Sequence, residues 1–178
     1  MIRRISTLLT ASWLVLTAVP TVRAGDYDQA LFVISLAFPE LKNIGVFYDQ
    51  KGALLNLLEF ETSASKRFGV NIMLVPLDSK KLITPNTIRR TCSQFHIQGV
   101  LFIEDDMLVR PKSLAGNTVV SGAGNIPVVG INAHWLESGA WFVIGPGTNG
   151  LQISPKVKDP KIREALTEAA RALSAEDL

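Results

Sequence analysis

A chain of 178 residues, 47% of them hydrophobic, is long enough to bury one ordinary globular core. Its formal net charge of only +2 excludes the basic stripe of a nucleic-acid-binding protein, so we expect no nucleic-acid partner. Its one cysteine, Cys92, excludes an internal disulfide, and the helical pattern around it predicts a small buried apolar residue rather than a reactive thiol.

Residues 1–24 have the layout of a cleavable secretory signal. A basic start at Arg3 and Arg4 precedes an apolar run and a small-residue exit that ends at Ala24. The alternative is a membrane anchor, but the run is well short of the ~20 apolar residues that a spanning helix needs. No cysteine follows the run, so a lipid anchor is not indicated. We therefore expect an exported protein whose residues 25–178 form one α/β domain in the periplasm.

Removal of this leader changes the charge balance of the chain. The leader holds three arginines and no acidic residue, so the number of Lys and Arg residues falls from 18 to 15, against 16 Asp and Glu residues. The expected mature chain is therefore close to neutral.

The first half of the expected mature chain alternates helices with apolar strands. A short helical segment near residues 27–37 precedes a strand at 43–49, whose sequence NIGVFYD is apolar on both faces. Residues 52–68 place apolar side chains at steps of three, four and four, which indicates one buried helix face that Gly69 ends. Residues 70–77, VNIMLVPL, are the next predicted strand.

The second half continues the alternation. Thr84 and Pro85 open a helix with a hydroxyl cap and a proline whose missing N–H does no harm. A strand at 99–104, a helix led by Pro111 and a strand at 126–132 follow. Strands that are apolar on both faces and alternate with helices belong in a parallel sheet covered on both sides. The sequence therefore predicts a single doubly wound, mainly parallel, flavodoxin-like α/β sheet.

The tail departs from this alternation. Gly145, Gly147 and Gly150 match the spacing G-x-G-x-x-G of a dinucleotide-binding loop, but such a loop needs a helix directly after its third glycine. Here the apolar segments AWFVIG and LQIS flank the glycines, which is typical of a hairpin, and the next helix begins only at Asp159-Pro160. We therefore predict a hairpin-like extension, a C-terminal helix and no bound cofactor.

Polar or aromatic residues follow each of the four strands that the first two thirds of the sequence predict. In an open α/β sheet, ligands approach the carboxyl ends of the strands, so these residues are expected to share one edge. Together they would form a polar and aromatic rim for a small organic ligand. The candidate ligand-binding residues are Tyr48, Asp49 and Gln50 after the first strand, Asp78 after the second, Glu104, Asp105 and Asp106 after the third, and Asn132, His134 and Trp135 after the fourth.

These residues also have a purely structural interpretation. An acidic run such as residues 104–106 is typical of a solvated loop before the next helix, and Trp135 is typical of core or rim packing. The only other histidine, His96, is predicted to lie on a different edge from His134, so no metal site is expected. The sequence has no G-x-S-x-G elbow and no Ser/His/Asp set that the strand order would bring together, so we expect no enzyme.

Four segments together resemble a known family. They are ELKNIGVFYD, RFGVNIMLVPL, GVLFIEDDMLVRP and IPVVGINAHWLESGAWFVIGP, in that order over about residues 38–146. The series resembles the second lobe of the two-lobed periplasmic substrate-binding proteins of ABC transporters, of the type I shape. In this resemblance Asp49 and Asp105 match the family's residues after the first and third strands, and residues 126–128 and 139–140 match its later motifs.

The resemblance implies a solute-binding component of an ABC-type uptake system for a small organic molecule. The sequence departs from the family at Glu104, where proline is usual, and at Ala133, where an acidic residue is common. It also offers no room for a first lobe, so half of the ligand clamp is expected to be absent. A protein with a single lobe would bind its ligand in an open groove, pair with a second copy, or dock on another protein such as a membrane permease.

In the last third of the sequence, a strand, a G-A step, another strand and the sequence QISPK precede a helix. This pattern resembles, more loosely, that of small periplasmic regulators that hold a membrane-bound signalling protein in check. The alternative function is therefore a non-enzymatic interaction protein that acts on a membrane-bound partner.

Overall fold

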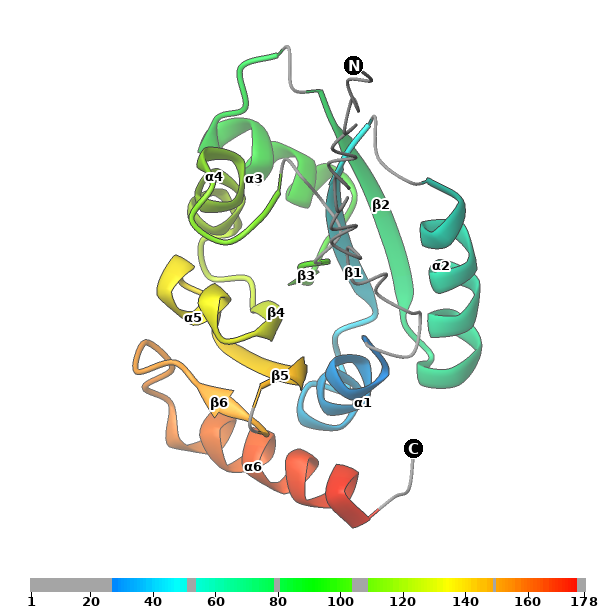
Figure 1. Cartoon of the computed structure of the whole chain (residues 1–178), viewed down its shortest axis with the longest axis vertical. Coiled ribbons are helices and arrows are strands. Elements are labelled where there is room, and N and C mark those ends of the chain that lie inside the picture. Colours follow the sequence, from blue (N-terminus) through cyan, green and yellow to red (C-terminus); the bar gives the residue numbers. More distant parts are fainter. Residues whose placement is uncertain (1–26, 51–53, 79–80, 104–108, 149, 176–178) are drawn as a thin grey trace, which may run out of the picture.

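Six strands form one sheet in the computed structural model, which describes residues 27–50, 54–78, 81–103, 109–148 and 150–175. The order across the sheet is β2-β1-β3-β4-β5-β6; β1 to β5 run parallel, and β6 pairs antiparallel with β5 (Figure 1). This order confirms the predicted doubly wound, mainly parallel sheet. The strands are β1 Asn43–Asp49, β2 Asn71–Leu77, β3 Gly99–Leu101, β4 Val128–Asn132, β5 Phe142–Gly147 and β6 Gln152–Ile153.

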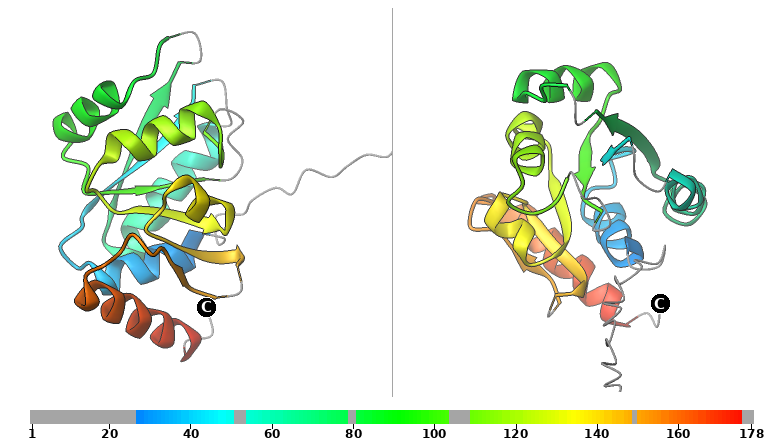
Figure 2. Two further views of the ribbon diagram at one scale, coloured as in Figure 1. Left: turned by 90° about the vertical axis from the view of Figure 1, so that its left-hand side faces the viewer. Right: turned by 45° about the horizontal axis from the view of Figure 1, so that its top comes forward.

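Helices cover both faces of this sheet. Figure 2 shows α3, α4 and α5 on one face, and α1 and α2 on the other, where α6 also packs. The helices α1 and α6 come from opposite ends of the described chain and lie side by side, so the C-terminal helix docks on the sheet as predicted. The helices are α1 Asp28–Ala37, α2 Leu54–Phe68, α3 Pro85–Gln94, α4 Leu114–Ala123, α5 His134–Ser138 and α6 Pro160–Ala175.

The strands are apolar throughout because each of them serves two cores. Successive side chains of a strand point to opposite faces of the sheet. On β1, Ile44 and Val46 join the cluster beneath α1, α2 and α6, whereas Phe47 joins the cluster beneath α3, α4 and α5. On β5, Phe142 and Val143 divide between the two clusters in the same way. This double burial is the physical reason that the strand sequences show no polar face.

Local signals in the sequence fix several element ends correctly. The Thr84 hydroxyl accepts a hydrogen bond from the Thr87 N–H at 3.2 Å and caps α3. Gly69 takes a left-handed φ of +64° directly after α2, where such a conformation ends a helix. Cys92 is a free cysteine that is buried on the inner face of α3, as predicted.

Other boundaries differ from the sequence-based expectation. Helix α4 begins at Leu114 and not at Pro111, because Lys112 has a φ of +63° that a right-handed helix cannot contain. Ser113 caps α4 instead, with its hydroxyl accepting from the Gly116 N–H at 2.9 Å. The strands β3 and β4 are shorter than predicted, and the short helix α5 was not predicted at all.

The glycine-rich tail forms the predicted hairpin and not a nucleotide-binding loop. Its third glycine, Gly150, has a φ of +79° and is followed by β6 rather than by a helix. A Cβ added at Gly145 would lie 2.9 Å from the Ile131 carbonyl oxygen, so this glycine permits the close approach of β5 to β4. The Thr148 hydroxyl closes the turn by donating to the Gly145 carbonyl at 2.8 Å.

No helix within the described part of the chain is long and apolar enough to cross a membrane. The predicted secretory signal at residues 1–24 lies outside the described residues.

Candidate functional site

The carboxyl edge of the sheet, where β1 to β4 end, brings together the described residues of the predicted site. Asp49 pairs in register with Leu77, the last residue of β2, and the Gln50 N–H donates to the Leu77 carbonyl at 3.0 Å. On the far side of β3, Asn132 pairs in register with Gly147 at the end of β5. These strands run parallel, so the residues that follow β1, β2 and β4 all lie at one edge of the sheet.

The part of the carboxyl edge formed by β1 and β2 is acidic. Tyr48 is buried in the core, Asp49 is half-buried and Gln50 is exposed. The Asp78 carboxylate lies 3.9 Å from the Lys81 ammonium, whose side chain is 83% exposed. An ion pair this long and this exposed to water is weak.

The middle of the carboxyl edge rests on two stacked aromatic rings. Phe102 follows β3 and Trp135 lies on α5; their ring centroids are 3.6 Å apart and the ring planes differ by 4°. Both side chains are fully buried, so Trp135 lies in the core beneath the edge and not on its rim. The Trp135 Nε1 has no hydrogen-bond partner among the described residues. The acidic residues Glu104, Asp105 and Asp106 lie outside the described residues.

The part of the carboxyl edge that follows β4 is positioned by the short helix α5. The Asn132 side-chain oxygen accepts a hydrogen bond from the His134 N–H at 2.9 Å, which fixes the step from strand to helix. Gly139 then ends the helix with a φ of +106°. The buried Trp135 anchors the helix on the sheet and leaves the His134 side chain exposed at the edge.

The sequence analysis did not predict one ion pair beside this site. The Lys112 ammonium forms an ion pair with the Glu137 carboxylate, and the Lys112 N–H donates to the Ser138 hydroxyl at 2.9 Å. The hydrogen bond and the charge of Lys112, and to a smaller degree the charge of His134, hold the pKa of Glu137 below its ordinary value. No local pattern in the sequence connects the loop before α4 with α5, so the sequence carries no signal for this contact.

Two leucines add exposed apolar surface near the same edge. Leu82, just before α3, and Leu114, the first residue of α4, are 86% and 84% exposed. Both helices begin after strands that end at the carboxyl edge, so both leucines lie on that side of the molecule. Isolated exposed leucines are ordinary on protein surfaces. Two almost fully exposed leucines beside the candidate site are more informative, because they add an apolar component to its rim.

The carboxyl edge thus combines carboxylates, an amide, an imidazole and apolar surface. The carboxylates of Asp49 and Asp78 suit a ligand with a cationic group, and the leucines suit an apolar part of a ligand or of a protein partner. Within the described ranges, no group of three or more His, Cys, Asp or Glu side chains is placed to hold a metal ion.

Comparison with known proteins gives structural matches only. No family model and no curated protein matches the sequence. A solved ABC domain from Streptococcus pneumonia in complex with L-Trp matches with a TM-score of 0.52 and 16% identity, over 84% of this chain and 46% of that one. A ligand-free, open substrate-binding protein with adhesive properties from Clostridium difficile matches with a TM-score of 0.50 and 16% identity, over 83% of this chain and 44% of that one.

The L-threonine transaldolase from Pseudomonas fluorescens matches more weakly, with a TM-score of 0.47 and 14% identity over 83% of this chain and 36% of that one, and this match supports no argument about chemistry. The two stronger matches show that the fold resembles that of substrate-binding proteins. This chain spans less than half of the length of either of them.

Proposed function

We propose that the carboxyl edge of the sheet binds a small organic molecule with a cationic amine, and that the chain is a non-enzymatic solute-binding component of an ABC-type uptake system. The observation that carries this proposal is the convergence of Asp49, Asp78, Asn132 and His134 on one edge of a fold that resembles substrate-binding proteins. The predicted secretory signal supports export to the periplasm, where such a component would meet its ligand.

The carboxyl edge forms one wall of the proposed site. In the proposed assembly the opposite wall comes from a second copy of the chain or from the membrane permease that receives the solute. The L-Trp bound to one of the structural matches makes amino acids the first ligands to test.

A thermal-shift screen of the purified chain against the L-amino acids, small amines and small organic acids tests this function. A ligand at 100 times its Kd adds about 2.7 kcal/mol to the free energy of unfolding, which raises the Tm by several degrees. We expect amines or amino acids to raise the Tm through the carboxyl edge. If no amine or amino acid of the panel raises the Tm, the solute-binding function is wrong.

Matched variants assign a positive result to the carboxyl edge. Asp49→Asn removes one carboxylate at the proposed site, whereas Glu168→Gln removes an exposed carboxylate from α6, on a different part of the molecule. We expect the first variant to weaken the binding of the identified amine by about tenfold, since hydrogen bonds to charged groups contribute about 1.5–3 kcal/mol. Glu168→Gln should leave the affinity unchanged. Equal losses of affinity in the two variants would show that the ligand responds only to the net charge of the protein.

A second candidate function is favoured by the two exposed leucines at the carboxyl edge. In this alternative the chain is an interaction protein that docks on a membrane-bound permease or signalling protein through Leu82 and Leu114. A photo-reactive amino acid at position 114, expressed in the native host, tests this function by cross-linking. Position 58 on α2 is the control, because Leu58 is 46% exposed but lies over the other face of the sheet.

The two candidate functions predict opposite results in these experiments. A docking protein gives a membrane-protein adduct from position 114, none from position 58, and no ligand in the thermal-shift screen. A solute-binding protein gives a ligand whose affinity depends on Asp49, with or without an adduct.

A further inference from the structure

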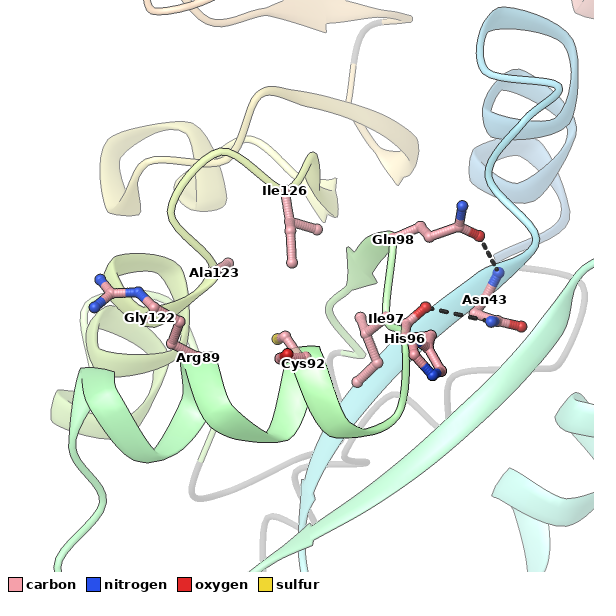
Figure 3. A pocket seen from close by; sticks show the side chains of 10 residues that line it. Asn43, Arg89, Cys92, His96, Ile97, Gln98, Gly122, Ala123 and Ile126 are labelled. Atoms are coloured by element: carbon pink, nitrogen blue, oxygen red, sulfur yellow. Dashed lines mark hydrogen bonds between the residues drawn. The ribbon is translucent and has the colours of Figure 1, made fainter.

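A groove lies at the amino edge of the sheet, opposite the carboxyl edge. It is an open groove of about 510 Å³ between the ends of α3 and α4 and the starts of β1 and β3 (Figure 3). This volume falls within the roughly 300–1,000 Å³ of typical small-molecule sites. We refer to it as the amino-edge groove, and its place on the sheet makes it independent of the function proposed above.

The floor of the amino-edge groove is apolar. Cys92, Ile97 and Ala123 are buried in the core beneath α3 and α4, and Ile126 covers them from the side. Burial raises the pKa of the Cys92 thiol, so this sulfur is a neutral part of the floor at neutral pH. A Cβ added at Gly122 would lie 2.4 Å from the Ile88 Cβ, which shows how closely α4 approaches α3 beside the groove.

One end of the groove is a fixed polar wall. The Gln98 side-chain oxygen accepts hydrogen bonds from the N–H groups of Lys42 and Asn43 at 2.8 and 3.2 Å. The Asn43 side chain donates to the His96 carbonyl at 3.2 Å, as drawn in Figure 3. These bonds tie the start of β1 to the loop between α3 and β3, so this wall exists before any ligand arrives.

The conformation of His96 also belongs to this fixed wall. His96 has a φ of +51°, in the left-handed position after α3 that glycine usually occupies. The Ile97 N–H donates to the Cys92 carbonyl at 2.8 Å and closes the end of the helix. Histidine is one of the few residues other than glycine that are enriched in this conformation, so the loop keeps an imidazole at the groove with limited strain.

The charges around the amino-edge groove have one sign. Its lining includes Arg89, whose side chain extends outward at one end of the groove, and His96, but no carboxylate. The only contact of the Arg89 guanidinium within the described ranges is a hydrogen bond of 3.2 Å to the neutral Asn86 side chain, and no carboxylate there pairs with it. Figure 3 shows Arg89 at one end of the groove and Gln98 and Asn43 at the other, with Cys92 and Ile126 between them.

We propose that the amino-edge groove is a binding site for a small organic monocarboxylate. The carboxylate pairs with the Arg89 guanidinium, whose planar fork matches two carboxylate oxygens. The apolar body of the ligand covers Cys92 and Ile126, and its far end reaches the wall formed by Asn43 and Gln98. An ammonium compound of the same shape is rejected, because the lining has no carboxylate to pair with it.

Three probes with the same six-carbon body and different head groups test this site on the full chain: hexanoate, hexylammonium and hexanol. Each is titrated at constant ionic strength while backbone amide resonances are followed by NMR. We expect hexanoate to shift the amides of Ser93, Gly122 and Ile126 in a saturable manner, and the other two probes to bind at least fivefold more weakly. The Gln50 and Ser138 amides report on the carboxyl edge. Shifts confined to that edge, equal binding of hexanoate and hexylammonium, or no saturable shift would overturn the proposal.

Neighbouring arginines supply a matched pair of variants. Arg89 lines the groove, whereas Arg90 is equally exposed on the same helix and does not line it. We expect Arg89→Ala to raise the Kd for hexanoate roughly tenfold, Arg89→Lys to raise it less, and Arg90→Ala to leave it unchanged. Both positions are exposed, so neither variant threatens folding. If Arg89→Ala and Arg90→Ala raise the Kd for hexanoate equally, the ligand responds only to the total charge of α3, and the proposal is overturned.

This outcome is independent of the solute-binding function. The screen for that function reports on Asp49 at the carboxyl edge, whereas hexanoate binding here depends on Arg89 at the amino edge. Either binding proposal can therefore be wrong while the other is correct.

Discussion

The carboxyl and amino edges differ in how their polar side chains are held. At the carboxyl edge, ion pairs join charged side chains on loops and on the short helix α5, whereas at the amino edge amide side chains bond to backbone groups around a groove. The ion pairs Asp78–Lys81 and Lys112–Glu137 are largely exposed to water, and such pairs are weak. At the amino edge, by contrast, Gln98 alone receives two backbone N–H groups and donates to the Glu40 carbonyl at 3.2 Å.

The two edges show that one sheet can support two kinds of surface. At the carboxyl edge, the stacked rings of Phe102 and Trp135 are buried one layer below the polar surface groups. At the amino edge, the hydrogen bonds of Gln98 lie in the surface layer itself. A wall that is hydrogen-bonded before a ligand arrives suits a preformed groove.

The largest effect is expected from a substitution beneath the carboxyl edge. A Cβ at Gly130 would lie 2.6 Å from the Trp135 Cβ, so Gly130→Ala must displace α5 or β4. We expect it to lower the free energy of unfolding by about 3 kcal/mol, the upper part of the range for overpacked cores. Urea unfolding followed by circular dichroism measures this loss.

The control for this prediction is Gly45→Ala on β1. A Cβ at Gly45 would meet only side-chain atoms of Ile97, at 2.9 Å, and these can turn away. We expect a clearly smaller loss than for Gly130→Ala. A loss of the same size at both positions would mean that the stacked pair is not what holds the carboxyl edge.

An intermediate effect is expected from the amide that organises the amino edge. Gln98→Ala removes an acceptor for two backbone N–H groups and a donor to one carbonyl; the bond to the Asn43 N–H is part-buried and the other two are exposed. We expect a loss of about 1–2 kcal/mol in the free energy of unfolding, since the backbone partners lose their bonds. Gln94→Ala, at the exposed end of α3, is the matched control and should change the stability by less than about 0.5 kcal/mol. If Gln98→Ala is as mild as Gln94→Ala, the wall of the groove is no more fixed than the loops of the carboxyl edge.

The sequence predicts the sheet well because the signals for it are local. The alternation of doubly apolar strands with helical segments determines the layers, and the Thr84-Pro85 and Gly69 signals determine helix ends within a few residues. The sequence likewise predicts the hairpin of the tail, because apolar segments flank its three glycines.

The details of both edges depend on contacts that no local pattern encodes. Helix α5 has five residues, too few for a helical period, and it exists because Trp135 is buried on the sheet while Gly139 ends the helix. The delayed start of α4 depends on Lys112, whose N–H bonds to Ser138 on another element. The sequence indicated that His96 and His134 lie on different edges, but not that Gly122 and Ile88 bring two helices together beside a groove.

The smallest effect is expected from the exposed ion pair of the carboxyl edge, and it has a defined dependence on pH. Lys112 holds the pKa of Glu137 in the folded chain below its value in the unfolded chain. The pair therefore contributes to stability above the unfolded pKa, and the contribution is lost as the pH falls through the lower, folded value. Lys112→Gln removes the contribution, so its Tm should lie slightly below that of the parent chain at neutral pH and should meet it in acid. Added salt should also close the gap, because exposed pairs are screened. A gap that survives both acid and high salt would mean that the Lys112 side chain stabilises the carboxyl edge through the packing of its aliphatic stem and not through its charge.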